Sequence, residues 1–143
     1  MERKLKSGEY ASAPAGGSVE TMTSACVSEL MNAATSFHKL HLKVNGTGSY
    51  AAHKALNELY DALPGHADDL AEGFQGASEK LLSYKDMAPR SLDSVQDGLS
   101  YIREMYAMVT GLQNKMPYSE IVNDLDNVKS TLNGIKYKLL FLK

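Results

Sequence analysis

Residues 37–74 read "FHKLHLKVNGTGSYAAHKALNELYDALPGHADDLAEGF". This stretch carries all four histidines of the chain and also Asp68 and Glu72, two carboxylates one helical turn apart. Its apolar residues recur at steps of three and four, which is the spacing of an amphipathic helix. The turn sequence NGTG at 45–48 interrupts this rhythm. We therefore expect two consecutive helices here.

The same apolar spacing runs through most of the remaining chain. It gives four stripes, each a set of residues on one face of an expected helix. The stripes consist of Val27, Leu30, Ala34, Phe37, His41 and Val44; His53, Leu56, Tyr60, Leu63, Ala67, Leu70 and Phe74; Leu92, Val95, Leu99 and Ile102; and Ile121, Leu125, Val128, Leu132, Ile135 and Leu139. Ser18, Ser91 and Ser119 are the expected N-caps of the first, third and fourth helices. Four amphipathic helices, each expected to exceed twenty residues, predict an all-α four-helix bundle.

Pro64 and Gly65 fall inside the second stripe. An interior proline costs a helix about 3 kcal/mol, because it removes one hydrogen bond and clashes with the preceding turn. The apolar spacing nevertheless keeps its phase across both residues. We therefore expect one continuous, kinked helix, with a true break as the alternative.

The composition is that of an ordinary globular domain. Residues 1–17 are rich in small residues, Gly and Pro, so we expect a flexible tail before a single domain at 18–143. The net charge of -2 gives no general argument for a nucleic-acid partner. The lone Cys26 excludes an internal disulfide, and neither a membrane-spanning run nor a signal-peptide core is evident. We expect a cytoplasmic protein without membrane partners.

His41 and His53 lie on the apolar stripes, where a solvated histidine is unusual. Asp68 and Glu72 share a face that lies off the second stripe, so one bundle cannot easily bring them to the histidines. A second subunit packed against that face can supply the missing half. The pattern predicts a nitrogen and oxygen site for iron or zinc shared across a homodimer. The alternative is a hydrogen-bonded histidine pair beside an unrelated, solvated acidic patch.

The stretch resembles the Dps family, the DNA-binding proteins from starved cells. The resemblance rests on "LHLKVNGTGSYAAH", which sets His41 and His53 twelve positions apart, and on Asp68 and Glu72 within "HADDLAEGF". It covers residues 37–74. The Glu-x-x-His pairs of the usual ferritin site are absent from this chain.

This resemblance implies a ferritin-like bundle that assembles into hollow dodecamers. Dps proteins bind ferrous iron between two-fold-related subunits, oxidise it, typically with hydrogen peroxide, and store the ferric mineral in the cavity. Carried over to this sequence, Asp68 and Glu72 of one subunit and His41 and His53 of its partner would ligate iron.

Two residues depart from the family pattern. Asn57 stands where the family has aspartate, so a neutral amide replaces an anionic acceptor. Leu42 replaces the tryptophan that follows the first histidine, and Tyr50 and Tyr60 are the nearby oxidisable rings. We expect weaker iron binding at Asn57 and either slow oxidation or a lost activity.

Two further sets of charged residues have possible roles. Glu120 and Asp124 open the fourth helix, where acidic groups complement the helix dipole; in the family, acidic residues of this region line an iron-entry pore. Arg3, Lys4 and Lys6 in the tail offer weak phosphate contacts that an oligomer would multiply, which makes them a candidate DNA arm. An inert tail is the alternative.

Three function classes are therefore open. The first is an iron-oxidising and iron-storing oligomer, and the second is an assembly protein that keeps the fold without the chemistry. The third, a metal-free helical adaptor, has to treat the histidine spacing as accidental. No nucleotide-binding motif, hydrolase triad or zinc ribbon is present.

Overall fold

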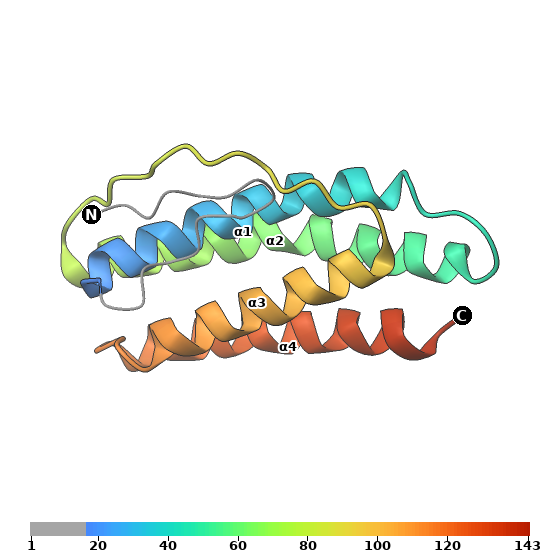
Figure 1. Ribbon diagram of the computed structural model, residues 1–143. Coiled ribbons are helices and arrows are strands. Elements are labelled where there is room, and N and C mark those ends of the chain that lie inside the picture. The colour runs from blue at the N-terminus through green and yellow to red at the C-terminus, as the bar shows by residue number, and fades with distance from the viewer. Residues whose placement is uncertain (1–16) are drawn as a thin grey trace.

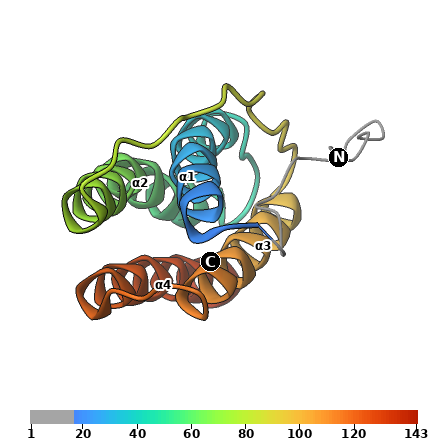
Figure 2. The ribbon, with the colours of Figure 1, turned by 90° about the vertical axis from the view of Figure 1, so that its left-hand side faces the viewer.

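The computed structural model describes residues 17–143, which form four helices and no strand. The helices are α1 (Val19–His41), α2 (Ser49–Ser78), α3 (Val95–Gln113) and α4 (Ser119–Phe141). α1 packs against α2 and α3, and α4 packs against the same two helices (Figures 1 and 2). The predicted all-α four-helix bundle is confirmed.

The connection between α2 and α3 sets the topology. Residues 79–94 form an extended crossover that runs the length of the bundle over α1 (Figure 1). α2 and α3 therefore run in the same direction, whereas α1 and α4 run in the opposite one. Each of the other two connections is a short turn between antiparallel helices.

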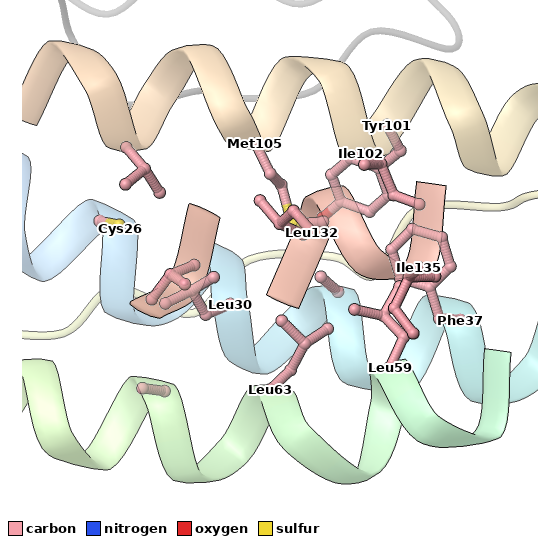
Figure 3. Close-up of a cluster of buried hydrophobic side chains, with 14 of the residues drawn as sticks. Cys26, Leu30, Phe37, Leu59, Leu63, Tyr101, Ile102, Met105, Leu132 and Ile135 are labelled. Atoms are coloured by element: carbon pink, nitrogen blue, oxygen red, sulfur yellow. The ribbon is translucent and has the colours of Figure 1, made fainter. Parts of the chain in front are cut away.

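The core is a continuous apolar layer between the four helices. Cys26, Leu30 and Phe37 reach it from α1, Leu59 and Leu63 from α2, Tyr101, Ile102 and Met105 from α3, and Leu132 and Ile135 from α4 (Figure 3). Leu30, Phe37, Leu63, Ile102, Leu132 and Ile135 lie on the stripes read from the sequence, whereas Cys26, Leu59, Tyr101 and Met105 are core residues that those stripes did not include. Met105 and Met116 are buried core residues, as expected of flexible apolar side chains.

The turn between α1 and α2 follows from its glycines. α1 ends at His41, and the chain reverses through residues 42–48. Gly46 and Gly48 have φ of 90° and 82°, a left-handed region that glycine enters without the clash of a Cβ atom. The NGTG sequence therefore ends the first helix as expected and places His41 close to the start of α2.

α2 is continuous from Ser49 to Ser78 with Pro64 inside it, so the predicted unbroken second helix is confirmed. The Ser18 cap is also confirmed, because its Oγ accepts the backbone N–H of Thr21. Three expectations were wrong. α3 begins after Ser94 and not after Ser91, and it has 19 residues where more than twenty were expected. Ser119 is the first residue of α4 and not its N-cap. Ser94 Oγ accepts the N–H of Asp97, which explains the later start.

The crossover is attached to the bundle at two places. Near its start, Gln75 Oε1 accepts the backbone N–H of Leu82 at 2.9 Å and the hydroxyl of Tyr84 at 3.0 Å. Near its end, Ser36 Oγ accepts the backbone N–H of Arg90, and Lys43 Nζ donates to the carbonyl oxygen of Leu92. Between these points the crossover is largely exposed.

Candidate metal-binding site

His41 and His53 meet where α1 ends and α2 begins. Their rings stack with centroids 3.9 Å apart and planes at 21°. His41 is buried, with 8% of its surface exposed, whereas His53 is half-buried. The two residues are separated by twelve positions in sequence, and the turn at residues 42–48 is what brings them face to face.

The hydrogen bonds of this histidine pair assign the tautomer of each ring. His41 Nδ1 lies 3.2 Å from the carbonyl oxygen of His38, and His53 Nδ1 lies 2.9 Å from that of His41. A carbonyl oxygen only accepts, so each Nδ1 carries the proton and donates it. With the proton on Nδ1, the lone pair of an uncharged imidazole lies on Nε2, which is the arrangement found in metal-binding histidines held by a backbone carbonyl.

Tyr60 and His38 extend the histidine pair toward the surface. The exposed ring of His38 stacks on Tyr60 with centroids 3.9 Å apart, and Tyr60 meets His41 edge-on at 5.1 Å. Tyr60 therefore holds two of the histidines in place. The sequence placed Tyr60 on the α2 stripe seven residues after His53, but it did not reveal that the ring turns toward α1.

Asp68 and Glu72 lie elsewhere on α2. Both are exposed, in agreement with their position off the apolar stripe. Asp68 follows His53 by fifteen residues, which is about 22 Å along a helix at 1.5 Å per residue. Within residues 17–143 of one chain, no three His, Cys, Asp or Glu side chains come together in a way that could hold a metal ion. A single chain thus separates the nitrogen donors from the carboxylates.

Asn57, one turn after His53, is half-buried and has a partner that the sequence analysis missed. Its Nδ2 donates to Oδ2 of Asp61 at 2.7 Å. The available signal was the i, i+4 spacing of these two residues on one helix face. The amide at this position is therefore fixed in direction by a carboxylate one turn further along α2.

The acidic residues at the start of α4 occupy a different region. Glu120 is exposed in the first turn of α4, and Asp124 is half-buried. His66 of α2 lies between the two helices, where its Nε2 is 2.9 Å from Oγ1 of Thr131. Burial lowers the pKa of His66, and the nearby Asp69 and Asp124 partly oppose that shift. His66 therefore has a polar role between α2 and α4.

A groove of about 520 Å³ lies between α2 and the end of α4. It is lined by Ala51, Lys54, Ala55, Asn57, Glu58, Lys138 and Leu142. An ion pair between Lys138 and Glu58 connects α2 with α4. Asn57 lies on one side of the groove, but neither His41 nor His53 lines it.

A second polar cluster lies inside the bundle, beneath the crossover. Tyr101 of α3 donates its hydroxyl to Oε1 of the buried Glu29 of α1 at 2.5 Å. The Arg90 guanidinium stacks over the Tyr101 ring at 3.9 Å and pairs with Glu104. Burial raises the pKa of the Glu29 carboxyl. Burial and the nearby Glu29 carboxyl together raise the pKa of the Cys26 thiol to about 12, so this thiol is protonated and unreactive.

Arg3, Lys4 and Lys6, the candidate DNA arm, lie outside the described residues. No helix of residues 17–143 is long and apolar enough to span a membrane.

The fold places the protein in the class of four-helix bundles, with a stacked histidine pair at the α1–α2 turn. Residues 41–139 match a family of unknown function, DUF5856, and the chain belongs to this family. The matched region begins at His41 and includes His53, Asn57, Asp68 and Glu72. No similar curated protein and no similar solved structure was found.

Proposed function

We propose that this protein binds ferrous iron between two copies of its chain, oxidises it and stores the ferric product, as Dps proteins do. The observation that carries the proposal is the histidine pair. In both His41 and His53, the Nδ1–H group donates to a backbone carbonyl oxygen, so the Nε2 lone pair would be left for a ligand. Metal-binding histidines usually donate their other ring N–H to a carboxylate, a backbone carbonyl or water, and both rings here share that arrangement.

The connectivity of the bundle is in keeping with this proposal. A four-helix bundle with one long crossover is the topology of ferritin-like folds. The crossover at residues 79–94 provides that connection. Because one fold hosts many functions, the topology supports the class of protein and leaves the chemistry to the site.

A two-fold axis on α2 would complete the ligand set. The midpoint between His53 and Glu72 in the sequence is also the midpoint between Asn57 and Asp68, and it falls between Ala62 and Leu63. Two antiparallel α2 helices crossing there place His53 opposite the partner's Glu72. Asn57 then lies opposite the partner's Asp68. The exposed carboxylates and the histidines thus become neighbours, about 14 Å on either side of the axis.

The resulting donors suit iron in both oxidation states. Neutral imidazoles from His41 and His53 bind ferrous iron well, and the carboxylates of Asp68 and Glu72 favour the harder ferric ion. Oxidation by hydrogen peroxide removes one electron from each of two ferrous ions, and two protons are consumed as two water molecules form. The carboxylates would hold the extra positive charge that this step creates.

The proposal extends to the assembled particle. A homodimer is the smallest unit that completes the site, and a hollow dodecamer is the expected assembly. Glu120 and Asp124 would then line an entry pore for iron. Arg3, Lys4 and Lys6 would contact DNA, so that consuming peroxide protects the DNA that the particle covers.

Anaerobic titration with ferrous iron followed by peroxide tests the proposal. The wild-type protein should bind iron and oxidise it, whereas the double variant Asp68→Asn, Glu72→Gln should lose most of the binding. Asp69→Asn is the matched control, because it removes a neighbouring charge from a different face of α2. Equal iron binding in the double variant and the control would exclude the intersubunit site and favour an assembly protein without ferroxidase chemistry.

Light scattering tests the assembly independently of iron. The chain has a mass of 15.6 kDa, and the proposed site requires at least twice this mass in solution. A monomer at micromolar concentration would contradict the shared site. For the DNA arm, the assembled particle should retard DNA in a gel at low salt, and removal of residues 1–10 should abolish the effect. An unchanged retardation after this deletion would exclude the arm.

A further inference from the structure

We propose that the guanidinium of Arg90 exchanges its partner, from Glu104 to Glu29, when Glu29 loses its proton. The exchange takes place in the polar cluster beneath the crossover, and it does not involve the proposed metal site. It makes the attachment of the crossover to the bundle dependent on pH.

Arg90 is close to two carboxyl groups, one buried and one exposed. Its guanidinium stacks over the Tyr101 ring at 3.9 Å, and the hydroxyl of that ring donates to Oε1 of Glu29 at 2.5 Å. Phe37 stacks on the same ring with centroids 5.4 Å apart, which helps to hold the hydroxyl in this direction. The Arg90 guanidinium itself forms an ion pair with the exposed Glu104 of α3.

The arrangement of the cluster is that of a neutral Glu29. The residue is 5% exposed, and its Oε2 has no hydrogen-bond partner among residues 17–143. A buried carboxylate with an oxygen left unpaired is far more costly than a buried neutral carboxyl group. A charged Glu29 would therefore draw a neighbouring cation, and Arg90 supplies the positive charge that acts on it.

The groups that face Glu29 decide when it ionises. Burial raises the pKa of Glu29. The hydrogen bond from Tyr101 and the charge of Arg90 lower this pKa, whereas the charge of Glu104 raises it. On the same helix, the Cys26 thiol stays neutral because burial and the Glu29 carboxyl raise its pKa to about 12. Burial also raises the pKa of the Tyr101 hydroxyl. In the described part of the chain, α2 and α4 contribute no group that acts on the pKa of Glu29.

The balance between the two ion pairs favours the exchange once Glu29 is charged. Glu104 is exposed, so water can replace the guanidinium there at little cost. The buried Glu29 has no such substitute, and an unpaired buried charge is strongly destabilising. The main chain need not move, because the backbone N–H of Arg90 donates to Ser36 Oγ at 2.8 Å and holds the crossover on α1.

The exchange changes which helices the crossover connects through this side chain. With Glu29 neutral, Arg90 ties the crossover to α3 through Glu104. With Glu29 charged, the same guanidinium ties it to α1. The crossover therefore holds α3 less firmly as the pH rises.

An NMR titration of the full-length protein tests the exchange. The ¹³C resonance of the Glu29 carboxyl reports its proton, and the ¹⁵Nε resonance of Arg90 reports the surroundings of the guanidinium. We expect both resonances to shift with one midpoint between pH 4 and 8. Glu29→Gln keeps position 29 neutral, so it should abolish the shift of the Arg90 resonance. A crystal structure at the upper end of this range should show Arg90 bonded to Glu29.

Two further variants separate the exchange from a general effect of charge. Glu104→Gln removes the competing carboxylate, so the pKa of Glu29 should fall. Glu58→Gln is the matched control, because it removes a carboxylate from the ion pair with Lys138 and should leave that pKa unchanged.

Three results would each overturn the exchange. The first is a Glu29 that stays protonated up to pH 8. The second is an Arg90 that remains bonded to Glu104 after Glu29 has ionised, as seen in the crystal structure or as a ¹⁵Nε resonance that does not follow Glu29. The third is the same pKa of Glu29 in Glu104→Gln and Glu58→Gln.

Discussion

Two polar clusters of this bundle use their hydrogen bonds in opposite ways. Glu29, Tyr101, Arg90 and Glu104 form a cluster whose partners all belong to one chain, from α1, the crossover and α3. Among residues 17–143, His41 and His53 each have a hydrogen-bond partner at one ring nitrogen, Nδ1. The first cluster joins three segments that are distant in sequence, although Oε2 of Glu29 has no hydrogen-bond partner among residues 17–143, whereas the second joins the end of α1 to the start of α2.

This difference separates a structural cluster from a candidate site better than burial does. Glu29 is 5% exposed and His41 is 8% exposed, so burial alone treats them alike. A buried group with partners on several segments helps to specify how those segments pack. The stacked rings of His41 and His53, each with Nδ1 at a backbone carbonyl, are the feature on which we base the proposed metal site. The two clusters should therefore respond differently to mutation and to metal.

The largest expected effect is stabilisation by iron. At a free ferrous concentration of 100 times the dissociation constant, binding to the folded state alone raises the free energy of unfolding by about 2.7 kcal/mol. Anaerobic thermal unfolding should show this increase in the wild type and not in His53→Ala. Tyr101→Phe should keep the increase, because Tyr101 belongs to the other cluster. A ferrous-dependent shift that survives in His53→Ala would place the metal elsewhere.

The next effect is the loss of the Tyr101 hydroxyl. Tyr101→Phe leaves the carboxyl of Glu29 without its donor in the core, which should lower the free energy of unfolding by about 1–3 kcal/mol. Urea unfolding measures this loss. Tyr106→Phe is the control, since Tyr106 is only half-buried on the same helix and should change stability by less than about 0.5 kcal/mol. Equal losses in both variants would mean that the hydrogen bond from Tyr101 to Glu29 adds little to the free energy of unfolding.

The smallest effect is a pH dependence that comes from Glu29. Burial raises its pKa above the ordinary value of 4.5, so the folded chain holds this proton more tightly than the unfolded chain. The stabilisation is complete below the unfolded pKa and is lost as the pH rises through the folded pKa. Glu29→Gln should remove this decline, whereas Glu79→Gln on the exposed end of α2 should retain it. Parallel stability profiles for wild type and Glu29→Gln between pH 4 and 8 would refute the prediction.

The helices were predictable because the spacing of apolar residues follows the helical repeat, and the same repeat sets which side chains face the core. The stripe on α2 runs through Pro64 without losing phase, and the helix is indeed continuous. The start of α3 was misplaced because Leu92 continues the apolar spacing although it belongs to the crossover. A buried residue in an extended segment is indistinguishable from a helical one when only its spacing is known. Ser94 decided the boundary through its bond to the N–H of Asp97.

For the candidate site, the sequence predicted on which helix faces its residues lie, and not how their side chains meet. The twelve-residue spacing identified His41 and His53, and the i, i+4 pair identified Asp68 and Glu72 on an exposed face. The contact of Tyr60 with His41 and the bond from Asn57 to Asp61 were missed. Both depend on side-chain direction around a helix, which spacing constrains only to a face.

The sequence by itself determined that four amphipathic helices pack around one core, because apolar periodicity fixes which face each helix must bury. It also indicated that His41 and His53 lie on the apolar stripes, whereas Asp68 and Glu72 lie off the stripe of α2 and are exposed. Only the tertiary structure decided that His41 and His53 stack, because the turn at residues 42–48 brings His53 Nδ1 to the carbonyl oxygen of His41. Hydrogen bonds between residues far apart in sequence form only where the packed helices bring those residues together.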